Sequence, residues 1–156
     1  MNIYYNYEPV TAEIMAVTGI FVFKENMKMK KKTIKVLKIA PHCKPETVTL
    51  INALESLQEA VSEGADSVGL IEVIPLTDTA SLLCNEEGKL IGLEPNRRIG
   101  YDVICGTFYV VGEYREGNLA SLSAKDMNYY MNRFAVPENI SAEEAMKALR
   151  FEIYPL

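Results

Sequence analysis

Residues 33–51 read TIKVLKIAPHCKPETVTLI, and this stretch predicts two β-strands joined by a turn. Its first part, 34–39, is rich in isoleucine, valine and leucine and stops before Pro41, which cannot continue a central strand. Its last part, 46–51, alternates threonine with apolar residues, the period of a strand with one buried face. We therefore expect a β-sheet to start here and the rest of the chain to pack on it.

The residues that follow predict one helix and further strands. Leucine and valine recur every three or four positions over 53–62, which indicates a helix with Asn52 as its N-cap. The run 68–74 is mostly apolar and predicts a central strand covered on both faces. Further expected elements are a strand at 81–85, its hairpin partner at 89–93, an irregular stretch at 94–98 and a strand at 107–111.

Two helices are expected near the end of the chain. Ser123 with Asp126 marks the start of the first, which carries a stripe of methionine and aromatic residues. Ser141 with Glu144 marks the start of the second, over 142–149. Together the elements predict an α+β fold: a single domain with a mixed or mainly antiparallel sheet of five to six strands and two to three packed helices.

Length and composition also predict one domain. The chain has 156 residues, 49% hydrophobic and 24% charged, which is the balance of a soluble globular domain. Residues 1–32 differ from the rest and end in the lysine-rich stretch MKMKKK, where a second start of translation would fit. We expect 33–156 to form the domain and 1–32 to be an N-terminal extension outside its core, either an added element or an extended reading of the gene.

No segment has the pattern of a membrane span or of a secretory signal. The longest apolar stretch, 14–23, has ten residues and is interrupted by Thr18 and Gly19, whereas a spanning helix needs about 20 apolar residues. The first 23 residues contain no Lys or Arg, and a secretory signal begins with a basic segment. We therefore expect a cytoplasmic protein without membrane contact.

The cysteines and the single histidine predict no metal and no cofactor. Cys43, Cys84 and Cys105 are odd in number and never closer than 21 positions, which excludes a Cys-x-x-Cys site and favours buried free thiols. His42 is adjacent to Cys43, and adjacent side chains on an extended chain point to opposite sides, which disfavours a catalytic pair. The chain has no glycine-rich phosphate loop. We expect no catalytic residue among these groups.

Charge is divided unevenly along the chain. Residues 24–44 hold eight Lys and one Glu, a net charge of +7, whereas 45–156 hold 18 acidic and eight basic residues, a net charge of −10. The lysines have no aromatic or arginine neighbour for stacking or base readout, so a solvated linker is favoured over a nucleic-acid-binding arm. The acidic remainder disfavours direct nucleic-acid binding and leaves open an acidic face that imitates nucleic acid.

Several short motifs resemble one family. They are CNEEGKL at 84–90, LEPNR at 93–97, GTF at 106–108, LESLQ at 54–58 and IEV at 71–73. This pattern, over about 33–134, resembles the uncharacterised domain of unknown function family numbered 3846. Its members look like small accessory proteins of phages, plasmids and conjugative elements of Gram-positive bacteria. The resemblance implies a setting, and it implies no activity and no catalytic residue.

One polar cluster is the candidate binding site, because turns at one end of a sheet can converge. It comprises Asn85, Asn96, Arg97, Arg98 and Asp102. Two adjacent arginines in an acidic domain are suited to bidentate bonds with a carboxylate or phosphate. The competing interpretation, which we favour, is that they pair with Glu86, Glu94 or Asp102 and only fix the loop.

These features favour a non-enzymatic accessory protein of a mobile genetic element that acts through a protein partner. Two alternatives stay open: an acidic nucleic-acid mimic of the anti-restriction type, and a small ligand-binding or enzymatic domain centred on Arg97 and Arg98. The surface discriminates among them. An apolar patch indicates a partner protein, a band of carboxylates indicates mimicry, and a deep pocket around Arg97 indicates a ligand. The oligomeric state does not follow from the sequence.

Overall fold

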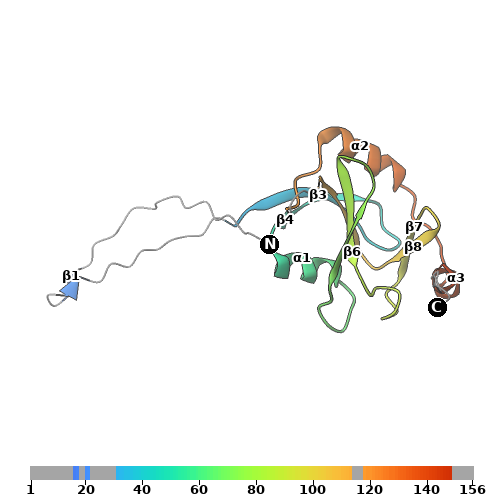
Figure 1. Cartoon of the computed structure of the whole chain (residues 1–156), viewed down its shortest axis with the longest axis horizontal. Coiled ribbons are helices and arrows are strands. Elements are labelled where there is room, and N and C mark those ends of the chain that lie inside the picture. The colour runs from blue at the N-terminus through green and yellow to red at the C-terminus, as the bar shows by residue number, and fades with distance from the viewer. Residues whose placement is uncertain (1–15, 18–19, 22–30, 114–117, 149–156) are drawn as a thin grey trace, which may run out of the picture.

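A computed structural model describes residues 16–17, 20–21, 31–113 and 118–148 (Figure 1). Their main feature is a five-stranded sheet in which all neighbouring strands are antiparallel. In spatial order the strands are β4 (Glu46–Ile51), β3 (Thr33–Ile39), β9 (Phe108–Gly112), β6 (Ala80–Asn85) and β5 (Ile71–Pro75). The chain forms a single α+β domain, as the sequence predicts.

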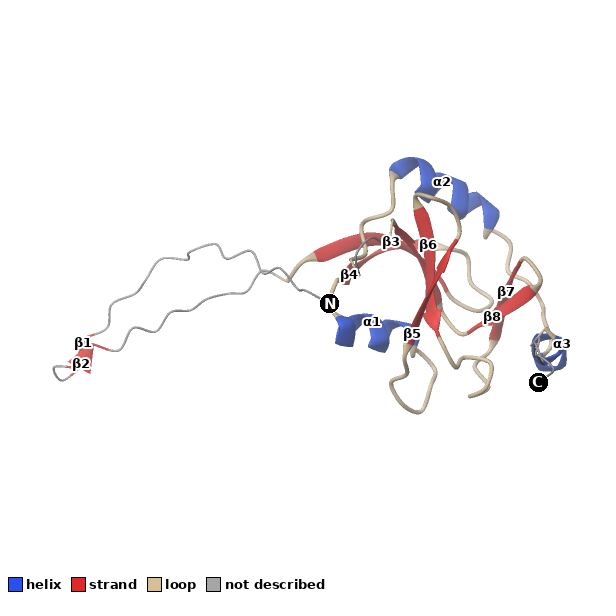
Figure 2. Cartoon of the chain, viewed as in Figure 1, coloured by secondary structure: helices blue, strands red, loops and turns tan. Residues whose placement is uncertain are grey.

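Helix α1 (Leu54–Val61) covers one face of the sheet (Figure 2). Its buried residues Leu57 and Val61 pack with the apolar side chains of that face, which are Ile34, Val36, Leu83, Tyr109 and Val111. The predicted N-cap role of Asn52 is wrong, because the N-cap position is Ala53. The Asn52 side-chain amide instead donates to the Leu119 carbonyl at 3.0 Å.

The opposite face is covered by α2 (Ala124–Arg133) and by a hairpin of β7 (Pro95–Ile99) and β8 (Asp102–Cys105). Buried Tyr130 of α2 and Phe134, the residue that caps it, belong to the core on this side. The Phe108 and Phe134 rings meet edge to face with centroids 5.4 Å apart. The predicted methionine and aromatic stripe is therefore the face by which α2 packs.

Helix α3 (Ala142–Lys147) packs on β8 and closes a third, smaller core. The buried residues of this core are Leu93, Val103, Cys105, Ile140 and Ala145. The predicted helix start is confirmed, because Ser141 Oγ accepts the Glu144 backbone N–H and the Glu144 carboxylate accepts the Ser141 backbone N–H. This capping box satisfies two backbone donors at the end of a short helix.

The predictions for 89–93 and 94–98 are wrong, and so is the central position predicted for the strand at 68–74. Residues 68–74 contain an edge strand, β5, which begins at Ile71 and pairs only with β6. An apolar run alone does not distinguish a central strand from an edge strand that follows an exposed loop. Residues 89–92 form turns and not a strand. The partners of β6 are β5 and β9, and not this stretch. The stretch expected to be irregular contains β7.

Two short strands, β1 (Ala16–Val17) and β2 (Ile20–Phe21), pair with each other near the N-terminus. The rest of 1–30 lies outside the described residues, so the division into an extension and a core domain stays a prediction. None of the helices in the described ranges has the length and apolar character of a membrane span.

Candidate functional site

Asn96 and Arg97 are neighbours on β7, and both side chains point into the interior. Neighbours on a regular strand point to opposite faces, but the register between β7 and β8 shifts between Pro95 and Arg97. Such a bulge adds one residue to one strand and re-aims the side chains beside it. Asn96 and Arg97 are therefore buried together, with 0% and 1% of their surface exposed.

The Arg97 guanidinium donates hydrogen bonds to carbonyl oxygens. Its Nη1 donates to the Asn96 side-chain Oδ1 at 2.8 Å and to the Asn96 backbone carbonyl at 3.2 Å. Its Nη2 donates to the Cys43 carbonyl at 2.8 Å and to the Phe134 carbonyl at 3.1 Å. Arg97 thereby connects β7 to the turn after β3 and to the end of α2.

No carboxylate forms an ion pair with Arg97 within the described ranges, and its Nε has no acceptor there. Burial lowers the pKa of Arg97, and the charge of Glu138 opposes this change. Taking a cation out of water is costly unless hydrogen bonds compensate, and charge-assisted bonds to carbonyls are of the stronger kind. Because Nη1 and Nη2 already serve these carbonyls, binding a ligand anion would require breaking those bonds.

Asn96 completes this buried cluster. Its Nδ2 donates to the Ile39 carbonyl at 2.9 Å and to the Gly106 carbonyl at 2.8 Å, while its Oδ1 accepts from Arg97. One amide therefore joins β7 to the end of β3 and to the turn between β8 and β9. Both amide N–H groups and the carbonyl oxygen are hydrogen-bonded within the protein, which is the arrangement of a structural side chain.

Arg98 points outward from the same strand and forms two ion pairs. Its Nη1 lies 2.7 Å from Glu138 Oε2 and its Nη2 lies 3.1 Å from Glu144 Oε1. The Arg98 backbone N–H also donates to Glu138 Oε1 at 3.1 Å. The expectation that the arginines pair with Glu86, Glu94 or Asp102 is wrong for Arg98, because its partners lie on α3 and just before it.

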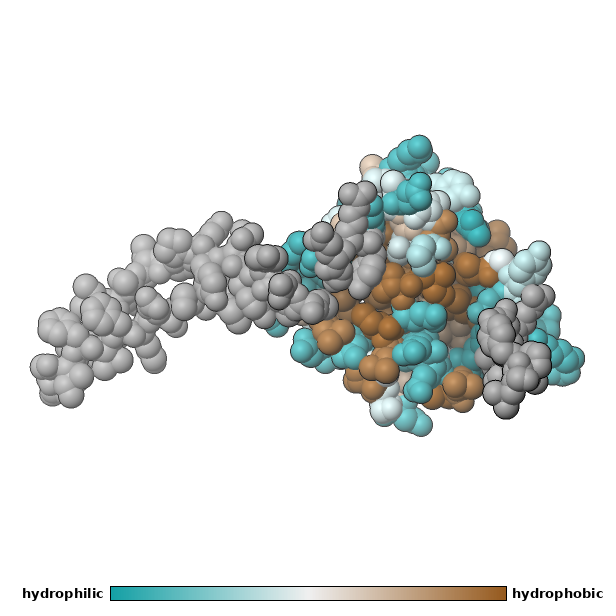
Figure 3. Space-filling model, in the orientation of Figure 1, coloured by the Kyte–Doolittle hydropathy of each residue, from teal (hydrophilic) through white to brown (hydrophobic). Residues whose placement is uncertain are grey.

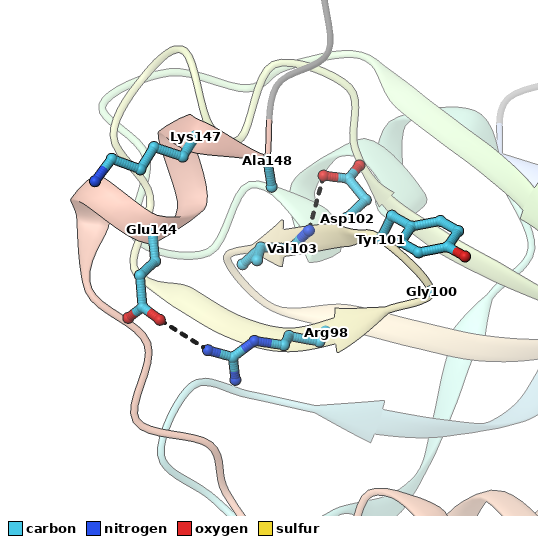
Figure 4. Close-up of a pocket in the computed structure, with 8 residues that line it drawn as sticks. All are labelled: Arg98, Gly100, Tyr101, Asp102, Val103, Glu144, Lys147 and Ala148. Carbon is cyan, nitrogen blue, oxygen red and sulfur yellow. Dashed lines mark hydrogen bonds and ion pairs between the residues drawn. The ribbon is translucent and has the colours of Figure 1, made fainter.

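A shallow hollow of about 220 Å³ lies between the β7–β8 turn and α3 (Figure 4). Its lining residues are Arg98, Gly100, Tyr101, Asp102, Val103, Glu144, Lys147 and Ala148. The charged members have partners of opposite charge: besides the pair of Arg98 and Glu144, the Asp102 carboxylate binds Lys89 Nζ, and Lys147 Nζ lies 2.6 Å from Glu143 Oε1. The hollow therefore brings Arg98 and Asp102 to one rim, with their charges balanced inside the protein.

Glu144, Cys84 and Cys105 are poorly suited to acid–base or nucleophilic chemistry. Hydrogen bonds from Ser141 lower the pKa of Glu144, which keeps this carboxyl ionised at neutral pH and unable to donate a proton. Burial raises the pKa of Cys84 to about 12 and also raises the pKa of Cys105. Both thiols therefore stay protonated, and the thiolate is the reactive form.

The cysteine prediction holds for two residues of three. Cys84 and Cys105 are buried free thiols, whereas Cys43 is a free thiol that is exposed. The described part of the chain contains no group of three or more His, Cys, Asp or Glu residues placed to hold a metal ion.

Asn85 lies apart from the other four predicted site residues. It is the last residue of β6 and faces the α1 side of the sheet, where its Nδ2 donates to Ser62 Oγ at 3.4 Å. Its Oδ1 accepts the Glu87 backbone N–H at 2.9 Å and shapes the following turn. The structure thus divides the predicted site into a buried cluster, a surface hollow and the isolated Asn85.

The turn after β3 supplies a contact that the sequence analysis missed. The Cys43 N–H donates to the Ala40 carbonyl at 3.2 Å, and His42 has a φ of 59°. Proline followed by a residue with positive φ is the pattern of a type II turn, in which glycine normally takes the His42 position. This turn presents the Cys43 carbonyl to Arg97, while His42 Nε2 lies 3.0 Å from Glu94 Oε1. The proline was a visible signal for the turn, but nothing in the sequence indicates its hydrogen-bond partner.

A second feature that the sequence analysis missed is an apolar surface along β5. Val68 and Leu70, in the loop before this strand, are 60% and 59% exposed. Ile71, Val73 and Ile74 of the strand are half-buried. We call these five residues the β5 surface. Their exposure follows from the place of β5 at the edge of the sheet, which a local sequence pattern does not reveal.

Comparison with known proteins gives a family and no activity. The family described as Domain of unknown function (DUF3846) matches residues 34–135. No curated protein and no solved structure matches the chain.

Proposed function

We propose that this chain, which belongs to the DUF3846 family of domains of unknown function, is a non-enzymatic accessory protein. In this proposal it binds a protein partner through the β5 surface. A phage or other mobile genetic element of Gram-positive bacteria as its source, and the cytoplasm as its location, are parts of the same proposal. The source rests on the resemblance of the sequence motifs described above. The location rests on the sequence analysis, in which the first 23 residues contain no Lys or Arg. Direct binding to nucleic acid is not part of the proposal.

The observation that carries the proposal is the grouping of exposed apolar side chains at one end of the sheet. Val68 and Leu70 begin the β5 surface, and Leu90 and Ile91, in the loop after β6, are 67% and 48% exposed. The two loops are joined at their base, where the Glu86 N–H donates to the Leu70 carbonyl at 3.0 Å. Single exposed apolar residues are ordinary, but a group of them close together is typical of a protein interaction site.

The visible face of the molecule agrees with this grouping. Apolar residues form a brown area across its middle in Figure 3, where β5 and β6 cross in Figure 2. Polar residues lie next to this area on several sides (Figure 3). An apolar centre with a polar rim is the usual anatomy of a protein interface.

An acidic mimic of nucleic acid is the second candidate function. Residues 45–88 contain nine Asp and Glu residues and no Lys, Arg or His. This span includes β4, α1, β5 and β6, and part of its charge lies beside the β5 surface, at Glu72 on β5 and Glu86 after β6. The Arg-centred ligand site has less support, because Arg97 is buried in internal hydrogen bonds and Arg98 is held by two carboxylates.

A pull-down with two variants tests the proposal. The full chain serves as bait in a lysate of cells that encode it, and bound proteins are quantified by mass spectrometry. The Val68→Asp/Leu70→Asp double variant should recover at least about tenfold less of the partner than the wild type, because aspartate opposes burial of the contact. Val136→Asp is the matched control, since Val136 is 77% exposed in the loop after α2.

The salt dependence of the same pull-down separates the two candidate functions. Binding through an apolar surface should survive a wash at high salt, whereas binding by a mimic of phosphate charges should be lost. The opposite result would contradict the proposal and support mimicry: Val68→Asp/Leu70→Asp and Val136→Asp recover the partner equally, and high salt releases it.

A further inference from the structure

We infer that the partner binds by adding an extended segment, basic and apolar in character, as a new strand on the open edge of β5. The inference rests on the proposed function, since it specifies how the β5 surface would be used. It concerns the backbone of the edge strand, whereas the proposed function depends on the exposed side chains.

The pairing of β5 with β6 decides which backbone groups are free. The Glu86 N–H donates to the Leu70 carbonyl and the Leu76 N–H donates to the Ala80 carbonyl, both at 3.0 Å. Hydrogen-bonded pairs alternate with non-bonded pairs along an antiparallel ladder. In the observed register, Glu72 and Ile74 therefore also bond to β6.

The remaining residues of β5 direct their backbone groups away from β6. Ile71 and Val73 present an N–H and a carbonyl each at the open edge, and no partner for these groups lies in the described part of the chain. Pro75 presents only a carbonyl, because proline has no N–H. The edge thus offers a short ladder centred on Ile71 and Val73 that ends at Pro75.

Apolar side chains flank this ladder on both sides of the sheet. Ile71 and Val73 pack toward the α1 side, and Ile74 packs toward the α2 side. An added strand would therefore have apolar neighbours for its alternate side chains on each face, which is how strand addition obtains specificity. Exposed Val68 and Leu70 extend the apolar contact beyond the first residue of β5.

The surrounding charge sets the character of the added segment. Glu72 lies on the strand, and Asp78 and Glu86 lie in the adjoining turns; all three are exposed, and no ion pair joins them to a Lys or Arg in the described ranges. A segment with lysine or arginine side chains complements this field and is repelled least. The expected occupant is an extended stretch in which basic and apolar residues alternate.

The other edge of the sheet provides an internal control. The Asn52 N–H donates to the Lys32 carbonyl, so alternate residues of β4 bond to β3. The backbone groups of Thr47 and Thr49 therefore point away from β3. The side chains at these two positions of β4 are threonines, whereas those at the matching positions of β5 are Ile71 and Val73. Both edges offer hydrogen bonds, but the β5 edge is preceded by a loop with the exposed apolar residues Val68 and Leu70.

The test uses a defined peptide with the full-length protein. The probe is the peptide Lys-Val-Lys-Val-Lys-Val-Lys with blocked ends, and its control is the same peptide with Glu in place of Lys. Amide hydrogen exchange read by NMR should show that the lysine peptide slows exchange at the Ile71 and Val73 N–H groups at least about tenfold. The exchange rates of the Thr47 and Thr49 N–H groups should not change, and the glutamate peptide should not bind.

Two N-methylated probes test the hydrogen bonds without changing the protein. One carries methyl groups on the valine nitrogens and the other on the lysine nitrogens, so only one of them blocks the side that faces β5. We expect one probe to bind at least about tenfold more weakly and the other to keep most of its affinity. Equal effects of the two probes, or protection at β4 in place of β5, would overturn the inference.

A proline variant tests the same edge from the side of the protein. Val73→Pro removes an outward N–H at an edge strand, where proline is tolerated, and Thr49→Pro removes an outward N–H at the other edge. With the fold of each variant checked by circular dichroism, only Val73→Pro should abolish peptide binding.

One outcome would overturn strand addition and leave the proposed function intact. In that outcome the wild-type protein does not bind the lysine peptide, but the Val68→Asp/Leu70→Asp variant still loses the partner in the pull-down. Protection of Ile71 and Val73 by a second copy of the chain, with no peptide bound, would also overturn strand addition.

Discussion

Arg97 and Arg98 are adjacent on β7, yet they belong to two regions with opposite environments. The interior cluster around Arg97 contains Asn96 and backbone carbonyls, and no carboxylate contacts it in the described ranges. The surface cluster around Arg98 contains Glu138 and Glu144 in contact with water. The comparison teaches that formal charge pairing is a poor guide to stability, because exposed ion pairs contribute little whereas unmet buried acceptors are costly.

The largest expected effect is that of replacing Arg97 by methionine. This change leaves the carbonyls of Cys43, Phe134 and Asn96 without their donor, so the free energy of unfolding should fall by about 3 kcal/mol. Urea unfolding followed by circular dichroism measures the change. Arg98→Met is the matched control, and its Tm should stay within about 2 °C of the wild type. Equal losses in the two variants would show that the two clusters do not differ as described.

Asn96→Ala should have the second largest effect. The Ile39 and Gly106 carbonyls lose a buried donor, which should cost about 2 kcal/mol of unfolding free energy. Because Asn96 also accepts from Arg97, the loss in the double variant Asn96→Ala/Arg97→Met should be smaller than the sum of the single losses. Strict additivity in the same urea experiment would show that the interior cluster is not one unit.

The smallest expected effect is a pH-dependent one in the surface cluster. Hydrogen bonds from Ser141 and the charge of Arg98 lower the pKa of Glu144 below its ordinary value of 4.5. A carboxyl with a lowered pKa in the folded state stabilises the fold above its unfolded pKa, and this contribution is lost as pH falls through the folded pKa. The Tm of Glu144→Gln should therefore lie slightly below that of the wild type at pH 7.

The Tm difference between Glu144→Gln and the wild type should vanish in acid. Thermal melts between pH 7 and pH 2 provide the measurement, with Glu143→Gln as the neighbouring control. A difference that persists at the lowest pH would mean that Glu144 acts through packing, not through its charge.

Local patterns predicted much of the fold. The β3 and β4 strands, the three helices and the capping box at Ser141 each follow from residues close together in the chain. The central position predicted for 68–74 and the predictions for 89–93 and 94–98 failed, because strand order and strand partners depend on contacts between distant residues. An apolar run reports burial on average and does not report which neighbour a strand takes.

The candidate site was less predictable than the fold. The sequence identified Arg97 and Arg98 as unusual, but a bulge between Pro95 and Arg97 decides which side chain points inward. Bulges leave no reliable sequence signal, since they depend on the register of the opposite strand. The partners of Arg98 lie 40 and 46 positions away, beyond the reach of any local motif.

The interior cluster also constrains the order in which the domain assembles. The Arg97 acceptors at Cys43 and Phe134 are 54 and 37 positions away, and the Asn96 acceptor at Ile39 is 57 positions away. Each contact must await the closure of a long loop, which slows folding more than local contacts do. The guanidinium loses its water only after β3, β7 and α2 are in place. Detachment of α2 would break the bond from Arg97 to the Phe134 carbonyl, so this bond couples α2 to β7.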